Sequence, residues 1–221
     1  MTERPKSPRE IASTEVPIVF VIDDDESTRR GLTNLFESVG LQVQAFSSAP
    51  ELLHGKLPDV PSCLVLDIRL PGVSGLDFQI LLEKAAIHIP IVFMTGHGDI
   101  PMSVKAMKAG AADFLPKPFR QQEMLDAVTA AIERDRKRRQ DEKIVSNAQA
   151  LFETLTPRER DVLALVAGGL MNKQIAAELG IAEITVKIHR GHIMKKMGTR
   201  SLADLVKITE MLRIQREALT H

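Results

Sequence analysis

The chain of 221 residues contains neither tryptophan nor tyrosine, and aromatic residues make up only 4% of it. Proteins that bind single-stranded nucleic acid commonly stack its bases on aromatic side chains, so this composition argues against that class of function. No apolar stretch is long enough to cross a membrane, and the polar first 15 residues lack the apolar core of a signal peptide. We therefore expect a cytoplasmic protein with no membrane partner.

The chain also lacks net charge, because 29 basic and 29 acidic residues cancel. The balance conceals an asymmetry along the sequence. Residues 1 to 133 contain 12 Lys and Arg against 18 Asp and Glu, whereas residues 155 to 221 contain 11 against 7. An acidic first part and a basic last part predict two domains with different partners.

One apolar run, residues 62 to 66, leads to a single carboxylate, Asp67, and is then broken by Pro71 and Gly72. Such a run predicts a strand buried on both faces, as in a parallel sheet covered by helices. Cys63 is the only cysteine, so an intramolecular disulfide is excluded, and its place in the run indicates a small core residue. Asp67 is expected at the carboxyl edge of the sheet, where open α/β folds bind their ligands.

Short apolar runs alternate with amphipathic segments from Val16 to about Arg134, which is typical of βα units that form a parallel sheet. The predicted strands are Ile18 to Ile22, Leu41 to Phe46, Ser62 to Leu66, Ile89 to Met94 and Ala112 to Leu115. The predicted helices run from about Glu26 to Val39, from Ser48, from Gly75, from about Met102 to Ala109, and from the residues after Pro118. The sequence therefore predicts a doubly wound, five-stranded parallel α/β domain.

The predicted strand ends bring acids, a hydroxyl and an ammonium to one edge of this sheet. Asp23 and Asp24 follow the first strand, Asp67 the third, Thr95 the fourth and Lys117 the fifth. Clustered carboxylates repel one another unless a proton, a lysine or a divalent metal neutralises them. An all-oxygen site that also meets a phosphoryl group suits Mg²⁺. Solvated acids without a function would leave this coincidence at neighbouring strand ends unexplained.

This set of residues resembles the receiver domain of bacterial two-component response regulators, and Gly-His-Gly-Asp-Ile-Pro at residues 96 to 101 resembles its FixJ-like branch. The resemblance covers residues 16 to 134 and implies a flavodoxin-like sheet of strand order 2-1-3-4-5. It implies that Asp67 accepts a phosphoryl group from a sensor histidine kinase. It also implies Mg²⁺ or Mn²⁺ as the metal, with these ligands: Asp23, Asp24, Asp67 and the backbone carbonyl of Arg69.

The same resemblance assigns Thr95 and Lys117 to the phosphoryl oxygens and Phe114 to an aromatic switch position. Thr95 would move toward the new phosphoryl group, and Phe114 would fill the space left behind. Arg69 and His97 lie two residues after key positions, where the family tunes the phosphoryl lifetime, although both are equally well interpreted as ordinary loop residues. The Lys117-Pro118 bond is a candidate for the cis form, which is accessible chiefly before proline.

The helix after Pro118 is expected to continue beyond the first domain. Met124, Val128 and Ile132 mark one buried face, but residues 134 to 143 are mostly charged and have no apolar face. Neither glycine nor proline interrupts the segment before Pro157, so we predict an exposed helical linker over residues 135 to 154, helical as far as Val145. Because acids are interspersed, a solvated face is favoured over a nucleic-acid arm.

A second domain is predicted from residue 155 to residue 212, followed by a tail over residues 213 to 221. Thr156, Pro157 and Glu159 form a helix start with an N-cap, a proline in the first turn and a capping glutamate. The predicted helices are Pro157 to Ala167, Asn172 to Leu179, Glu183 to Met197, and Ser201 to about Leu212. The short turn at Gly180 between the second and third helices predicts an all-α, four-helix domain with a helix-turn-helix.

The second domain resembles the LuxR/NarL-type DNA-binding domain through its segments Leu-Thr-Pro-Arg-Glu, Asn-Lys-Gln-Ile-Ala, Thr-Val-Lys-Ile-His and Lys-Lys-Met-Gly. Four residues of the third helix are predicted to pack inward: Val186, His189, Ile193 and Met197. The resemblance implies double-stranded promoter DNA as a partner, with Lys187 and Ile188 at base edges. The other implied contacts are Ile184, Gly191 and Lys195 on the same outer face, and Lys173, Thr185, Arg190 and Lys196 at phosphates. Ile184 and Gly191 depart from the polar residues usual in the family.

The leading hypothesis is a response-regulator transcription factor that forms a homodimer on activation, with RNA polymerase as a further partner. A phosphatase with an aspartyl nucleophile is the alternative from another class, but Arg69 stands where such enzymes place a general acid. In a third interpretation the receiver is a dimerisation module and DNA binding is constitutive. The exposed positions Ile184 and Ile188 allow another alternative, in which the receiver covers them in the inactive protein.

Overall fold

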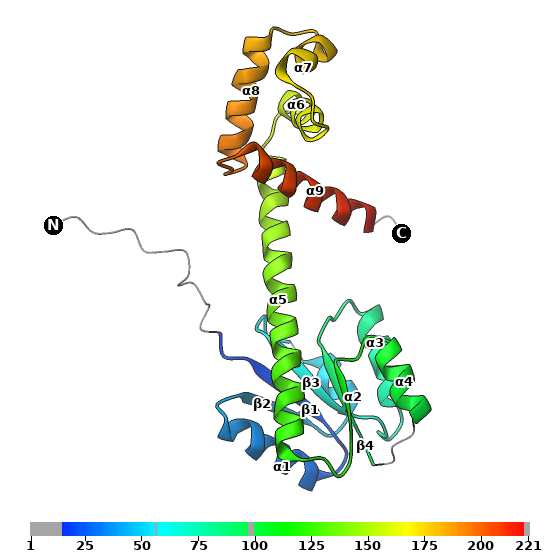
Figure 1. The fold of residues 1–221 in the computed structure, drawn as a ribbon. Coiled ribbons are helices and arrows are strands. Elements are labelled where there is room, and N and C mark those ends of the chain that lie inside the picture. The colour runs from blue at the N-terminus through cyan, green and yellow to red at the C-terminus, as the bar shows by residue number, and fades with distance from the viewer. Residues whose placement is uncertain (1–14, 56, 97–99, 219–221) are drawn as a thin grey trace, which may run out of the picture. The chain divides into compact units, whose positions relative to one another are not determined.

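The computed structural model describes residues 15–55, 57–96 and 100–218. The chain divides into two compact units, residues 1–139 (the first unit) and residues 140–221 (the second unit), which are described separately below (Figure 1). Within the described residues, no helix is both long enough and apolar enough to span a membrane.

The first unit contains a five-stranded parallel sheet of order β2-β1-β3-β4-β5. The strands are β1 (Ile18–Ile22), β2 (Gln42–Phe46), β3 (Ser62–Asp67), β4 (Ile91–Thr95) and β5 (Asp113–Pro116). The strands agree with the predicted ones to within two residues at each end, and the strand order is the one that the resemblance implied. Asp67 is the last residue of β3, and β3 lies between β1 and β4 in the middle of the sheet.

Helices cover both faces of this sheet (Figure 1). They are α1 (Glu26–Ser38), α2 (Ala49–His54), α3 (Gly75–Lys84), α4 (Ile100–Lys108) and the first part of α5 (Gln121–Glu153). On one face Leu64 and Leu66 of β3 belong to the same apolar cluster as Phe78 of α3, whereas on the other Cys63 and Val65 join residues of α1 and α5. Successive residues of β3 thus enter opposite cores, which explains why the strand is apolar at every position.

Helix α4 begins at Ile100, two residues before the predicted Met102. Pro101 is tolerated in this first turn because the backbone N–H that it lacks would have no partner within the helix. His97 and the other residues of 97–99, which belong to the FixJ-like motif, lie outside the described residues. The Lys117–Pro118 peptide bond is cis.

Helix α5 differs from the predicted linker in two respects. It continues to Glu153, eight residues beyond Val145, because nothing in the segment breaks a helix and its last turn packs: Leu151 and Phe152 contact the apolar core of the second unit. The prediction of an exposed segment from residue 135 was wrong at its start. Asp135 is 0% exposed, and hydrogen bonds from the Ser62 backbone N–H and from two arginine side chains offset the cost of burying its charge.

The second unit consists of α6 (Pro157–Ala167), α7 (Asn172–Leu179), α8 (Glu183–Lys196) and α9 (Leu202–Ala218) together with the end of α5. The predicted capping box is present, since Thr156 Oγ1 accepts from the Glu159 N–H at 3.3 Å and the Glu159 carboxylate accepts from the Thr156 N–H at 2.8 Å. Gly180 ends α7 in the left-handed region, at φ 63°. The predicted helix-turn-helix is confirmed.

Helix α9 continues six residues beyond the predicted end at Leu212. The added residues include Arg, Gln, Glu and Ala, which are strong helix formers, and no proline or glycine interrupts them. Ser201 caps the helix start, since its Oγ accepts from the Asp204 N–H at 3.1 Å.

Candidate functional site

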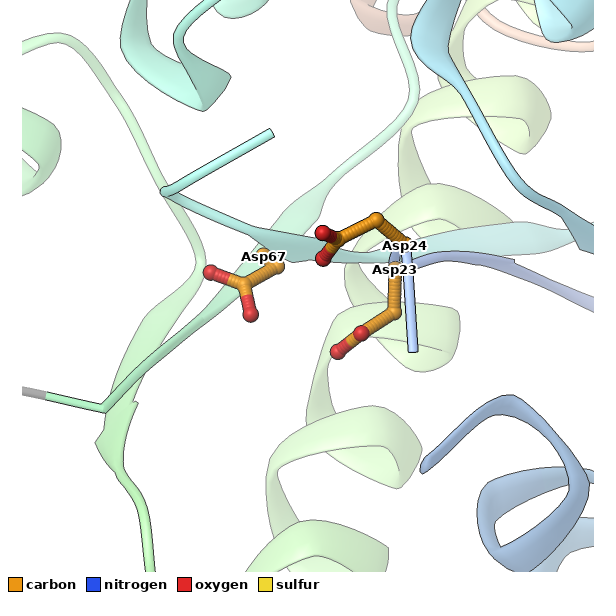
Figure 2. A group of neighbouring side chains, drawn as sticks. All are labelled: Asp23, Asp24 and Asp67. Carbon is orange, nitrogen blue, oxygen red and sulfur yellow. The ribbon is translucent and has the colours of Figure 1, made fainter. Parts of the chain in front are cut away.

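Three carboxylates meet at the carboxyl edge of the sheet in the first unit. Asp23 and Asp24 directly follow β1, and Asp67 ends the neighbouring strand β3 (Figure 2). One oxygen from each carboxylate lies within 4.8 Å of the others. Asp23 is 1% exposed and Asp67 is 7% exposed, whereas Asp24 is open to solvent. The β1–β3 pairing therefore brings together the acids that the sequence placed at separate strand ends.

Lys117 joins two of these acids. Its Nζ donates to Asp67 Oδ2 at 2.6 Å and to Asp23 Oδ2 at 2.7 Å. The Lys117 backbone N–H donates to the Thr95 carbonyl at 2.6 Å, so the residue after β5 is tied to the end of β4. Burial alone lowers the pKa of Lys117, but the hydrogen bonds to Asp23 and Asp67 outweigh it and raise that pKa. Lys117 therefore stays an ammonium and offsets the charge of the acids.

Burial acts in the opposite direction on Asp23. It raises the pKa of this carboxyl above its ordinary value, although the hydrogen bonds from Lys117 and from the Asp25 N–H favour the charged form. A divalent cation would favour the charged form further, because it adds positive charge beside a carboxylate that burial destabilises. Asp23 therefore belongs to an acidic site that nearby cations stabilise.

Backbone and side-chain donors fix the loops that carry the acids. Asp67 Oδ1 accepts from the Arg69 N–H at 2.8 Å, and Asp23 Oδ1 accepts from the Asp25 N–H at 2.9 Å. Arg29 of α1 donates to the carbonyl oxygens of Asp23 at 2.7 Å and of Asp24 at 3.0 Å. Arg29 was not predictable as a site residue from the sequence. An arginine on an amphipathic helix has no local feature that distinguishes a structural donor from a solvated side chain.

Thr95 and Phe114 lie on the same face of the sheet. Phe114 of β5 pairs with Phe93 of β4, and Thr95, two residues after Phe93, pairs with Pro116. Residues two apart on a strand point to the same face, so Thr95 shares a face with Phe93. Phe114, which pairs with Phe93, lies on that face too. Thr95 is buried, whereas Phe114 is half-buried and packs against the apolar cluster of that face. The arrangement fits the switch pair expected from the resemblance.

The donor set suits a hard divalent cation. Three carboxylates supply only oxygen atoms, and the exposure of Asp24 leaves room for water in the coordination shell. Among the residues that the structure describes, neither a thiolate nor an imidazole belongs to the cluster, which disfavours Zn²⁺ and copper. The residues present therefore fit Mg²⁺ or Mn²⁺.

A second candidate surface lies on α8 in the second unit. Its inner side contributes Val186 and Ile193 to the core, and Met197, directly after the helix, joins them, as predicted. His189 is half-buried. Its outer side exposes Ile184 (64%) and Ile188 (52%). The basic residues Lys187 and Lys195 and the small residue Gly191 are exposed on the same helix.

Two of the four predicted phosphate contacts, Arg190 and Lys196, form side-chain hydrogen bonds within the second unit. Lys173 is exposed and Thr185 is half-buried at the surface, but Arg190 donates to Asn172 Oδ1. Lys196 has partners within the unit: its ammonium donates to the buried Glu159 carboxylate at 2.7 Å and to the Thr154 carbonyl at 3.2 Å. Lys196 thus has a structural role within the unit, and its phosphate contact stays a prediction.

Comparison with known proteins covers both units. Residues 19–129 match the model for the response regulator receiver domain, and residues 153–209 match the model for bacterial regulatory proteins of the luxR family. "Nodulation protein W" of Bradyrhizobium diazoefficiens is 68% identical over 92% of this chain and 89% of its own length. "Transcriptional regulatory protein FixJ" of Azorhizobium caulinodans is 42% identical over 86% of this chain and 90% of its own. The solved structure of response regulator StyR is 52% identical, with a TM-score of 0.79 over 88% of this chain and 98% of that one.

Proposed function

This chain belongs to the two-component response regulators that combine a receiver domain with a luxR-family DNA-binding domain, and we propose that phosphorylation of Asp67 controls its dimerisation and promoter binding. It is a regulator of transcription, and its two domains imply a kinase partner and a DNA partner. The chain would then consist of a receiver over residues 16–134, a helical linker over 135–154 and a DNA-binding domain over 155–212. Promoter binding would take place in the cytoplasm.

The observation that carries the proposal is the position of the Asp67 carboxylate. It is nearly buried, it lies 2.6 Å from the Lys117 ammonium, and it adjoins Asp23 and Asp24. A carboxylate with a structural role needs one cationic partner, whereas two further acids beside it would only repel it. A phosphoryl acceptor needs both features, because the transferred group brings negative charge and requires cations around it.

In the proposed transfer, an oxygen of Asp67 attacks the phosphorus of a phosphohistidine on the sensor kinase. The new O–P bond forms as the N–P bond breaks, and the electron pair of that bond stays on the imidazole nitrogen, which takes up a proton. The Lys117 ammonium would move one of its hydrogen bonds from Asp67 to a phosphoryl oxygen. The Arg69 N–H keeps Asp67 oriented, because it donates to Oδ1 at 2.8 Å.

Asp23, Asp24 and Asp67, with the backbone carbonyl of Arg69, would hold Mg²⁺ or Mn²⁺. When bound, the metal supplies positive charge that offsets the charge on the phosphoryl oxygens. Arg29 supports this set through its hydrogen bonds to the carbonyl oxygens of Asp23 and Asp24, which fix the chain at the end of β1.

The response to phosphorylation would be a packing change on the face that carries Thr95 and Phe114. The Thr95 hydroxyl would turn toward the phosphoryl group, and the half-buried Phe114 would move inward over the space that it leaves. A changed surface near β5 would then favour a homodimer, which would present two α8 helices to paired half-sites of double-stranded promoter DNA. RNA polymerase would be the further partner at the promoter.

The test is phosphorylation of the full chain with Mg²⁺ and acetyl phosphate, followed by detection of an acid-stable, base-labile phosphate. Asp67→Asn should abolish labelling, whereas Asp77→Asn, at an exposed position of α3, should leave it unchanged. Labelling that survives Asp67→Asn refutes the assignment. Many rapid turnovers per molecule would instead support the phosphatase alternative.

Sedimentation and DNA binding measured with and without acetyl phosphate test the output. The proposal expects a shift from monomer to dimer and tighter promoter binding after phosphorylation. Equal DNA affinity in both states would support constitutive DNA binding with the receiver as a dimerisation module.

A further inference from the structure

A cavity of about 440 Å³ opens at the amino edge of the receiver sheet. Its walls come from α3, from the segment that leads into β4, from the residues directly after α4 and from α5. Ile91, the first residue of β4, lines the cavity, whereas Asp67 and Thr95 end β3 and β4 at the opposite edge of the sheet. The volume lies within the range of small-molecule sites, roughly 300–1,000 Å³. The cavity is therefore separate from the proposed phosphorylation site.

Gln79 of α3 is a nearly buried polar side chain that lines this cavity together with the apolar residues Leu82 and Ile91. It is 7% exposed, and its Nε2 donates to the Ala109 carbonyl at 2.7 Å. Its Oε1 is buried and accepts no hydrogen bond from any residue that the structure describes. A buried acceptor without a donor costs free energy. Gln79 therefore indicates a ligand that brings a hydrogen-bond donor.

The same side of the cavity carries negative charge. Glu83, four residues after Gln79 on α3, is exposed and is the only acid among the described residues that line the cavity. Helices α3 and α4 end beside the cavity, at Lys84 and Lys108, and the partial negative charge of a helix C-terminus favours a cation. An ammonium group meets both requirements, because it can donate to Gln79 Oε1 and offset the charge of Glu83.

Arg134 and Arg138 of α5 line another side of the cavity. Arg138 is paired with the buried Asp135 at 2.7 Å. Arg134 is exposed, and no residue in the described part of the chain forms an ion pair with it. One unpaired guanidinium favours a ligand group with a single negative charge, and its planar fork matches the two oxygens of a carboxylate.

We propose that this cavity binds a small zwitterion that carries an ammonium, a carboxylate and an apolar body. The ammonium donates to Gln79 and pairs with Glu83, and the carboxylate pairs with Arg134. The apolar body lies against Leu82 and Ile91. An α-amino acid with an apolar side chain shares this chemistry with an amino acid whose two charged groups stand at opposite ends of a carbon chain. Because the site does not use Asp67, the receiver has a second input that is independent of phosphorylation.

The experiment records methyl NMR spectra of the full-length chain during titration with L-leucine and, separately, with 6-aminohexanoate. Binding should shift the methyl signals of Leu82, Ile89 and Ile91, which line the cavity, and leave that of Ile184 on α8 unchanged. A Kd on the order of 1 mM is ordinary for ligands of this size. The probe that binds more tightly shows whether the two charged groups of the ligand lie on one carbon or apart.

Derivatives of the tighter probe identify the two charge contacts. Acetylation removes the ammonium and amidation removes the carboxylate, so each should weaken binding about tenfold or more. Glu83→Gln should remove most of the effect of acetylation, and Arg134→Gln should remove most of the effect of amidation. Lys137→Gln is the matched control, since Lys137 is exposed on α5 outside the cavity, and it should bind both probes as the parent chain does.

Three outcomes would overturn the inference. Cavity methyl signals that stay unchanged with both probes refute a zwitterion site, while the proposed phosphorylation and DNA binding remain unaffected. Acetylated and amidated probes that bind as tightly as the parent probe refute recognition of the two charges. Full effects of acetylation in Glu83→Gln and of amidation in Arg134→Gln refute the assignment to these residues.

Discussion

Asp135 and Ser62, 73 residues apart in sequence, are joined by a buried hydrogen bond in which the Ser62 N–H donates to Asp135 Oδ2 at 2.9 Å. Ser62 opens β3, the strand that ends in Asp67, and Asp135 lies on α5. The side chains of Arg138 and Arg139 donate to the same carboxylate at 2.7 and 2.6 Å, and Arg139 also pairs with Asp59. The start of the strand that carries the proposed phosphoacceptor is thus attached to the helix that leaves the receiver.

Replacement of Asp135 by alanine should destabilise the receiver by about 3 kcal/mol or more, because it leaves the Ser62 N–H buried without its acceptor and removes the shared partner of two arginines. Hydrogen exchange of the full-length chain, followed by mass spectrometry, should show faster exchange across β3 and α5. Asp141→Ala, at an exposed position of the same helix, is the matched control and should leave exchange in β3 unchanged. Equal protection of β3 in the two variants would contradict the anchoring role.

Gly75 at the start of α3 lies against the end of β3, and a Cβ at this position would meet the Asp67 carbonyl oxygen at 2.7 Å and Ile68 Cα at 3.0 Å. Both neighbours are backbone atoms, so Gly75→Ala should displace the segment that carries Asp67. We expect a loss of about 1–3 kcal/mol in the free energy of unfolding of the receiver and a slower phosphorylation by acetyl phosphate. Gly31→Ala in α1 is the control: its Cβ meets nothing within 4 Å, so this variant should be neutral or more stable by about 0.5–1 kcal/mol. Comparable melting temperatures and labelling rates for both variants would refute the proposed contact.

Lys117→Met should reduce the initial rate of Asp67 labelling by acetyl phosphate about 100-fold or more, the usual effect of removing one preorganised donor from a charged transition state. It also leaves Asp23 and Asp67 without their shared ammonium partner. The rate is measured from phosphate incorporated per chain at saturating Mg²⁺. Lys84→Met, at the exposed end of α3, should retain the parent rate. A Lys117→Met chain that is labelled as fast as the Lys84→Met chain would remove Lys117 from the mechanism.

Glu159 should make the second unit more stable at neutral pH than in acid. The hydrogen bond from Lys196 and the bond from the Thr156 N–H lower the pKa of Glu159 from 4.5 to about 2. Because this folded-state pKa is depressed, the stabilisation is fully present above about pH 4.5 and is lost as the pH falls through about 2. Glu159→Gln should therefore be less stable than the parent chain at pH 7, and the difference should shrink between pH 4.5 and 2. Hydrogen exchange of α6 measures it.

Glu178→Gln provides the control for this pH dependence, since Glu178 is exposed on α7. Its α6 protection should follow that of the parent chain at every pH. A constant difference between parent and Glu159→Gln across this range would show that the carboxylate charge of Glu159 does not stabilise the unit.

Much of the fold could be predicted from the sequence because its signals are local. The apolar runs that became β1, β3 and β4, the capping box at Thr156 and the turn at Gly180 depend on residues a few positions apart. The resemblance to receiver domains added the strand order, which no local pattern contains. With that order, acids at the ends of β1 and β3 had to lie close together, so the acidic cluster was predictable from the sequence.

The tertiary structure alone decided which charged side chains pair and which are buried. Lys117 reaches Asp23 and Asp67 across 94 and 50 residues, and Asp135 reaches Ser62 across 73. The charged stretch that contains Asp135 gave no sign of burial, because one carboxylate among arginines has the same local pattern whether it faces solvent or a strand end. The extension of α5 to Glu153 likewise depends on Leu151 and Phe152 finding a core formed by residues much later in the chain. Local periodicity determines the elements, but long-range hydrogen bonds and packing determine the partners.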